Sequence, residues 1–205
     1  MQNYSQSNQD LYVYENFFKN KTKGVFVDIG AHDGKTLSNT LFYENLGWEG
    51  ICVEPLPAIY KKLVLTRKCK CVCGAVSDKD TDTVEFNAIE GYSEMLSGII
   101  DNYDPRHSER VERELDSYGG SKSIIKVPNF KFNELVEYTH IDFLSIDTEG
   151  NELNILKTID FNKYFIDVIT VENNFAEPYL ANFLCPLGYE FITRLEADSL
   201  FKRKI

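Results

Sequence analysis

The sequence has 205 residues, a length that suits one domain with a substantial core. Hydrophobic residues make up 43% and charged residues 26%, which argues against a disordered or membrane-spanning chain. With 32 acidic and 22 basic residues the net charge is -10, so a broad nucleic-acid-binding surface is not expected. No apolar run reaches the roughly 20 residues of a membrane span, and residues 1–10 are polar. We therefore expect neither a membrane span nor a secretory signal, and a cytoplasmic location.

The first part of the chain alternates short apolar runs with helical spacings. Residues 24–29 predict a buried strand that ends in a glycine-rich turn, and apolar positions recur at helical spacing over residues 36–46. A strand over 50–54, a helix over about 57–66 and a strand over 69–75 follow. Two strand-helix-strand crossover units are therefore expected.

The middle of the chain departs from this alternation. After a predicted strand over 83–87, residues 88–123 are rich in glycine and charge. They include a helix candidate over 108–118 with little apolar face. We interpret residues 88–123 as an insertion or lid, and residues 1–20 as an N-terminal extension of one domain spanning 1–205.

A short strand over 124–127 and a short helix over 132–138 come next. Regular alternation then resumes with strand 141–147, helix 151–159, strand 168–172, helix 177–187 and strand 190–194. Such alternation predicts an α/β fold of the Rossmann-like, doubly wound type, with a mostly parallel sheet and helices on both faces.

Acidic side chains gather at the predicted strand ends, beyond which open α/β sheets bind ligands. The turn with Gly30, Ala31 and Gly34 resembles a nucleotide loop. Glu54 lies 20 residues after Gly34, where a carboxylate can accept both ribose hydroxyls. The three-glycine dinucleotide fingerprint is incomplete, and Asp28 would oppose a pyrophosphate. Asp28 would instead attract a cation, such as the sulfonium of S-adenosylmethionine.

Four segments make the chain resemble the FkbM-like methyltransferases, a branch of the class I S-adenosylmethionine-dependent enzymes. They are residues 26–34 (FVDIGAHDG), 50–55 (GICVEP), 74–78 (GAVSD) and 141–153 (IDFLSIDTEGNEL). The resemblance implies the class I methyltransferase fold, S-adenosylmethionine as cofactor and methylation of an oxygen, often on a sugar or another hydroxylated metabolite. The cofactor-binding positions that it implies are Asp28, Gly30, Ala31 and Gly34 around the methionine part, Glu54 on the ribose, and Ala75 and Val76 along the adenine.

Oxygen-bearing side chains at two adjacent strand ends suggest how a hydroxyl could be activated. Asp147, Glu172 and Asn173 offer three ligands of the kind that magnesium or calcium prefers, similar to the metal site of catechol O-methyltransferases. A bound cation would acidify the acceptor hydroxyl. Without metal, the same residues could act as a carboxylate base cluster. Glu149 and His32 are further candidate catalytic residues, and no lysine base is evident near Asp147.

Two other functions stay open at this point: an NAD(P)-dependent oxidoreductase, and an S-adenosylmethionine-binding protein without catalysis. The expected partner is a small-molecule or glycan acceptor beneath residues 91–120. Within that segment His107, Arg106 and Arg110 could meet an acidic or sugar-phosphate acceptor, although a solvated charged helix is the simpler interpretation. Neither the identity of the acceptor nor the oligomeric state follows from the sequence.

Overall fold

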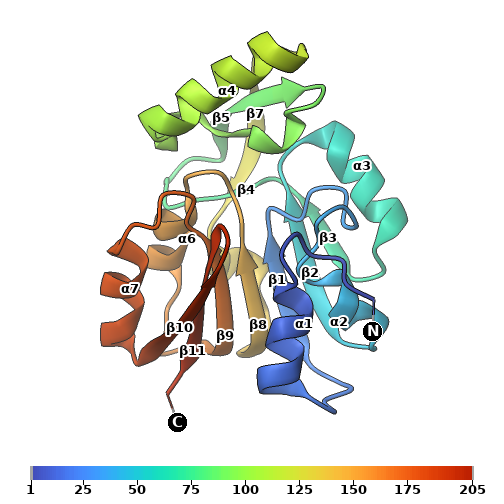
Figure 1. The fold of residues 1–205 in the computed structure, drawn as a ribbon, viewed down its shortest axis with the longest axis vertical. Helices are drawn as coiled ribbons and strands as arrows, with labels where there is room; N and C mark the ends of the chain where they lie inside the picture. The colour runs from blue at the N-terminus through green and yellow to red at the C-terminus, as the bar shows by residue number, and fades with distance from the viewer. Residues whose placement is uncertain (1, 205) are drawn as a thin grey trace.

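The computed structural model describes residues 2–204 and contains two sheets (Figure 1). The main sheet has seven strands in the order β10-β11-β9-β8-β1-β2-β3. Its strands are β1 (Val25–Ile29), β2 (Glu49–Glu54), β3 (Lys70–Cys73), β8 (His140–Ile146), β9 (Phe165–Glu172), β10 (Tyr189–Leu195) and β11 (Asp198–Arg203). The second sheet has the order β4-β7-β5-β6. Its strands are β4 (Ala75–Val76), β5 (Thr83–Glu90), β6 (Gly98–Ile99) and β7 (Ser121–Phe130).

The main sheet is mostly parallel, as the sequence predicts. Strands β3, β2, β1, β8 and β9 pair in parallel, whereas β11 runs antiparallel to both β9 and β10. All the parallel strands therefore end at one edge of the sheet, where the acidic residues of the sequence motifs follow them.

Helices cover both faces of the main sheet, which confirms the doubly wound α/β prediction. The helices are α1 (Gln9–Val13), the π-helical turn η1 (Tyr14–Phe18), α2 (Leu41–Asn45), α3 (Pro57–Thr66), α5 (Phe132–Leu135), α6 (Glu152–Thr158) and α7 (Tyr179–Leu184). Alternate residues of β1 serve the two faces. Val27 and Ile29 pack with α5, α6 and α7, and Phe26 packs on the face of α1, α2 and α3.

The second sheet and helix α4 (Pro105–Tyr118) form a separate layer at one end of the molecule (Figure 1). The layer also contains the short 3₁₀ helices η2 (Glu94–Leu96) and η3 (Ile100–Asn102), so most of the predicted segment 88–123 lies in it. Helix α4 begins three residues before the predicted 108, because Asp104 caps it by accepting from the Arg106 amide. Val111 of α4 packs on Ile89 and Leu96.

The predicted strand over 69–75 is wrong in one respect, because it breaks at Gly74. A side chain there would lie 2.6 Å from the Phe130 ring and 2.9 Å from the Pro128 carbonyl oxygen. After Gly74 the chain leaves the main sheet, and β4 pairs with the end of β7. The main sheet and the second sheet therefore meet where β3 ends.

The predicted helix over 36–46 is also wrong at its start, since only α2 forms. Residues 36–40 form a loop in which Leu37 is 44% exposed and has a φ of 55°. The side chains of this loop bind the main sheet instead: Asn39 donates to Ser145 at 3.1 Å and Thr40 donates to Asp28 at 2.5 Å. These tertiary contacts outweigh the helical spacing of the apolar residues.

Candidate functional site

A cavity of about 270 Å³ lies between the carboxyl ends of the main strands and the second sheet. Ten of the predicted site residues line it: Asp28, Gly30, Ala31, His32, Glu54, Ala75, Val76, Asp147, Glu149 and Glu172. Gly34 and Asn173 are not among the lining residues. The cavity thus unites residues at or near the ends of five strands, β1, β2, β4, β8 and β9, that are distant in the sequence.

Gly30 allows the ends of β1 and β8 to approach each other closely. Its φ is 90°, and a Cβ there would lie 1.6 Å from the carbonyl oxygen of Asp147. The amides of Gly30 and Ala31 both donate to the Val53 carbonyl at 3.0 Å, which ties the turn to β2. A residue with a side chain at position 30 would therefore separate the two strand ends that build the site.

Glu54 is a buried carboxylate at the end of β2. Its oxygens accept from the Leu56 amide at 2.8 Å and from the His32 amide at 3.1 Å. Burial raises the pKa of Glu54 to about 7, against the lowering effect of these two amides, and the charges of Glu94 and Asp28 raise it further. Each oxygen keeps a second lone pair that can accept from a ligand hydroxyl.

Asp28 and Gly34 differ in their relation to the cavity. Asp28 lines it, and burial raises the pKa of this carboxyl although Arg67 and the Thr40 hydroxyl lower it. Gly34 packs away from it, because a Cβ there would lie 2.6 Å from both Leu63 and Arg67. Gly34 therefore packs closely on Leu63 of α3 and on Arg67, and its contact with a cofactor stays a prediction.

His32 contributes an imidazole with free hydrogen-bonding capacity. Its Nε2 lies 3.2 Å from a Glu94 carboxylate oxygen, yet neither ring nitrogen has a hydrogen-bond partner among residues 2–204. The backbone at His32 has a φ of 48°, so its side chain leaves a tight turn. A polar group without a hydrogen-bond partner in a cavity wall indicates that this part of the wall can bind a polar ligand.

Three carboxylates meet at the edge of this cavity. Asp147, Glu149 and Glu172 place one oxygen each within 4.8 Å of the others. Desolvation by the surrounding protein raises the pKa of both carboxyls, although Asp147 is exposed in the cavity wall and Glu172 is buried, and the negative charges of neighbouring acids, including Glu149, raise both pKa values further. Closely spaced carboxyls of this kind share protons and can act as bases near neutral pH.

Asn173 does not join the carboxylates as the sequence predicts. Its Oδ1 accepts from the Glu177 amide at 2.9 Å, and its Nδ2 donates to the Glu177 carbonyl at 2.9 Å and to Ser199 Oγ at 3.1 Å. Asn174 takes the place near the cluster and donates to Glu172 at 2.7 Å. Glu149 lies with Asp147 and Glu172, while the side chain of Asn173 is bound by Glu177 and Ser199.

A second cavity of about 280 Å³ lies on the other side of the same carboxylates. Glu149, Glu172 and Asn174 line both cavities. Helix α4 contributes His107, whose Nδ1 lies 3.2 Å from Glu149 and whose Nε2 lies 3.0 Å from the Leu96 carbonyl oxygen. Ligands in the two cavities would meet at the carboxylate cluster.

Other lining residues come from segments that the sequence analysis left unassigned. Gln6 and Gln9 of the N-terminal extension reach the first cavity, where Gln9 donates to Asp198 at 2.8 Å. Asn39 lines it as well. A signal for these residues would have required knowing that α1 and β11 lie beside the strand ends.

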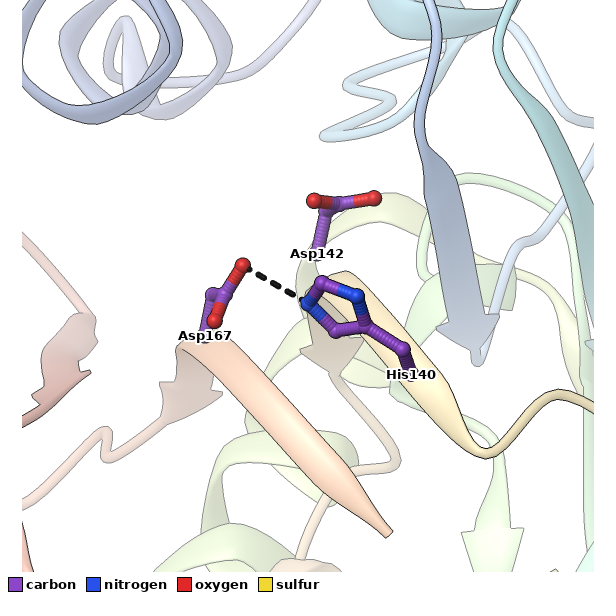
Figure 2. A group of neighbouring side chains, drawn as sticks. All are labelled: His140, Asp142 and Asp167. Carbon is purple, nitrogen blue, oxygen red and sulfur yellow. Dashed lines mark hydrogen bonds and ion pairs between the residues drawn. The ribbon is translucent and has the colours of Figure 1, made fainter.

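A second group of possible metal ligands, His140, Asp142 and Asp167, lies near the opposite ends of β8 and β9 (Figure 2). His140 Nε2 lies 3.0 Å from Asp167, while Asp142 accepts from the Val25 amide at 2.8 Å and pairs with Lys21. Both oxygens of Asp142 are thus engaged by the segment that leads into β1. We assign this group a structural role.

The first cavity fits S-adenosylmethionine. Buried carboxylates at Glu54 and Asp28 suit hydroxyl donors and a positive centre, and His32 has unpartnered nitrogens. Ala75 and Val76 form an apolar wall on which a flat ring can lie.

No helix among residues 2–204 is both long and apolar enough to cross a membrane.

Comparison with known proteins identifies the family of the chain. The family model described as the methyltransferase FkbM domain matches residues 28–195. No curated protein matches the chain. A similar solved structure is M. capricolum TrmK in complex with S-adenosyl-homocysteine, at 9% identity and a TM-score of 0.45, with 96% of this chain and 67% of that chain covered. The chain belongs to the FkbM methyltransferase domain family and is an S-adenosylmethionine-dependent methyltransferase.

Proposed function

We propose that the protein transfers the methyl group of S-adenosylmethionine to a hydroxyl oxygen of a sugar or a similar small hydroxylated molecule. The observation that carries this proposal is the carboxylate cluster of Asp147, Glu149 and Glu172, in which Glu149 and Glu172 line both cavities and Asp147 lines the first. An alcohol must lose its proton as its oxygen takes up a methyl group, and a carboxylate at the reacting oxygen can accept that proton.

In this proposal the first cavity holds the cofactor. Glu54 accepts from the ribose hydroxyls, Ala75 and Val76 line the adenine, and Asp28, Gly30 and Ala31 surround the methionine part. When bound, S-adenosylmethionine supplies an electrophilic methyl carbon on a positively charged sulfur. The chain holds the acceptor oxygen against that carbon, and this positioning accounts for much of the rate.

The carboxylate cluster then receives the hydroxyl proton. The raised pKa values of Asp147 and Glu172 support this role, since a base is most effective when its pKa lies near the working pH. His107 and Asn174 contact the cluster from two different segments and orient Glu149 and Glu172. His32, on the cofactor side, is a second candidate for contact with the reacting groups.

Metal assistance by magnesium or calcium is a second candidate mechanism in the same place. It is favoured by the three oxygen ligands within 4.8 Å of one another, a donor set that suits a hard divalent cation. A cation there would lower the pKa of an acceptor hydroxyl directly. The two mechanisms use the same carboxylates and differ in their response to chelation.

Radiolabelled S-adenosylmethionine tests the proposal with a panel of hydroxylated glycans and glycosides. We expect label in an O-methylated product. Excess chelator should leave turnover unchanged if the carboxylates act alone, and should abolish it if a cation is required. Label found only on nitrogen, or label that never leaves the cofactor although S-adenosylhomocysteine binds, would contradict the proposed function.

A further inference from the structure

The second cavity combines aromatic rings with polar groups around the shared carboxylates. Tyr103, Phe175 and Tyr179 contribute the rings, and Asn102 and Asn154 contribute amides. Aromatic rings beside hydrogen-bonding side chains suit a molecule with both C–H surfaces and hydroxyls. A sugar ring or another cyclic polyol has this character.

The arginine in this wall is already neutralised. Arg106 Nε and Nη2 donate to Asp104 at 2.9 and 2.8 Å, and Nη1 donates to Glu177 at 3.2 Å. Its guanidinium carbon lies 3.7 Å from the centre of the Phe175 ring. All three nitrogens are therefore committed to carboxylates, and the flat face is stacked.

The other two basic residues of α4 that the sequence analysis singled out are engaged as well. His107 pairs with Glu149 through one ring nitrogen and contacts the Leu96 carbonyl oxygen through the other. Arg110 donates to Glu114 at 2.9 Å and lines the first cavity rather than the second. The cations that the sequence offered for an acidic acceptor are thus held by the chain's own acids.

Acidic residues outnumber basic ones in the wall of the second cavity. Its acids are Asp104, Glu149, Glu152 and Glu172, against Arg106 and His107. An anionic group brought beside them would lose water and meet like charge without a free cation to compensate. A hydroxyl or an ammonium group would instead find acceptor oxygens.

On the basis of the proposed function, we propose that the second cavity is the acceptor site and that it takes neutral or amino-bearing sugars and excludes those with carboxylate or phosphate groups. This reverses the expectation of an acidic acceptor raised by Arg106, His107 and Arg110. It also predicts that releasing Arg106 from its two acids will admit an anionic ring.

Three glycosides with the same ring test this charge selection. They are methyl β-D-glucopyranoside, its 2-amino-2-deoxy analogue and the corresponding methyl glucuronide, titrated by ligand-observed NMR into the protein saturated with S-adenosylhomocysteine. We expect the neutral and amino glycosides to bind, and the glucuronide to bind at least about tenfold more weakly. Equal or tighter binding of the glucuronide, or no binding of any of the three, would overturn the inference.

The variant D104N/E177Q removes both carboxylates from Arg106, and asparagine keeps the helix cap at position 104. We expect this variant to reduce the difference in affinity between the glucuronide and the neutral glycoside several-fold. The control is E112Q, which removes an exposed acid of α4 outside the cavity and should leave the difference unchanged. A folded D104N/E177Q variant with unaltered discrimination would also overturn the inference.

Methyl transfer from radiolabelled cofactor is measured on the same samples. Binding of the neutral glycoside without transfer would count against the proposed function and leave the charge selection intact. Transfer to the glucuronide as efficient as transfer to the neutral glycoside would count against the charge selection alone.

Discussion

The proposed cofactor side and the proposed acceptor side of this site are built in different ways. On the cofactor side, a carboxylate is held by amides of its own strand-end loops, as Glu54 is by Leu56 and His32. On the acceptor side, groups meet across separate layers, as His107 of α4 does with Glu149 after β8. The contacts of Glu54 follow from the geometry of the loops at the strand ends. The contact between His107 and Glu149 forms only when the layer with the second sheet and α4 packs on the main sheet. Substitutions on the two sides should therefore affect different measurements.

The largest expected effect is at Glu172, where the two sides meet. Glu172→Gln removes a carboxylate of the cluster with little change in shape, and we expect methyl transfer to fall by about 100-fold or more. S-adenosylhomocysteine affinity, measured by calorimetry, should change little. Asp167→Asn on the same strand, near its opposite end, is the matched control and should transfer at the normal rate. Normal turnover by Glu172→Gln would exclude Glu172 from proton removal.

On the cofactor side, Glu54→Gln should weaken S-adenosylhomocysteine binding by about 10- to 100-fold. A glutamine offers one acceptor oxygen where Glu54 offers two, so one of its amide donors or the ribose loses a partner. Calorimetric titration measures the loss. Glu49→Gln, at the exposed start of the same strand, is the control. Unchanged affinity in Glu54→Gln would remove Glu54 from the cofactor site.

The ionisation of Glu54 should affect folding stability and cofactor affinity in opposite directions as pH rises. Because the pKa of Glu54 is about 7 in the folded protein and 4.5 for an ordinary glutamate, the folded state binds more protons between these values. The stability that this group contributes is therefore complete below pH 4.5 and is lost as pH rises through 7. Cofactor affinity should rise over the same range, by up to about tenfold between pH 6 and 8, as the carboxylate ionises.

Chemical denaturation and calorimetry at several pH values measure both trends. Glu54→Gln serves as the reference, because it does not titrate in this range while the other acids remain. If the difference between the two proteins in unfolding free energy does not change with pH, Glu54 does not have a raised pKa.

On the acceptor side, His107→Ala should have a smaller effect. It removes the partner of Glu149 without touching the cofactor cavity, so we expect turnover to fall about fivefold and S-adenosylhomocysteine affinity to stay constant. His140→Ala, in the structural group near the opposite ends of β8 and β9, is the control. An equal loss of cofactor affinity in His107→Ala would show that α4 supports both sides of the site.

The main sheet was largely predictable because its strands are short apolar runs that end at glycine or acid. Strands β1, β2, β8 and β9 lie where these patterns placed them, and four of their ends carry the predicted acids. Strand β11 was not predicted, since residues 198–203 mix polar and basic residues and only pairing with β9 and β10 makes them a strand.

The details of the site depended on contacts that no local pattern contains. Asn173 and Asn174 are neighbours with equal side chains, and the turn after β9 directs one to Ser199 and the other to Glu172. Gly34 and Gly30 belong to one motif, yet the first packs on α3 and the second approaches Asp147. The types of the site residues and their approximate positions were thus predictable from the sequence, but the orientations of their side chains were not.

The pairing of Ala75 with Asn129 and of Val76 with Phe130 places the two ends of the added layer on adjacent strands. The intervening residues 77–128 consequently begin and end at nearly the same point. Such an arrangement lets the excursion grow, shrink or be grafted from another protein while the register of the main sheet stays fixed. Diversification of acceptor choice can then proceed without rebuilding the machinery that holds the methyl donor.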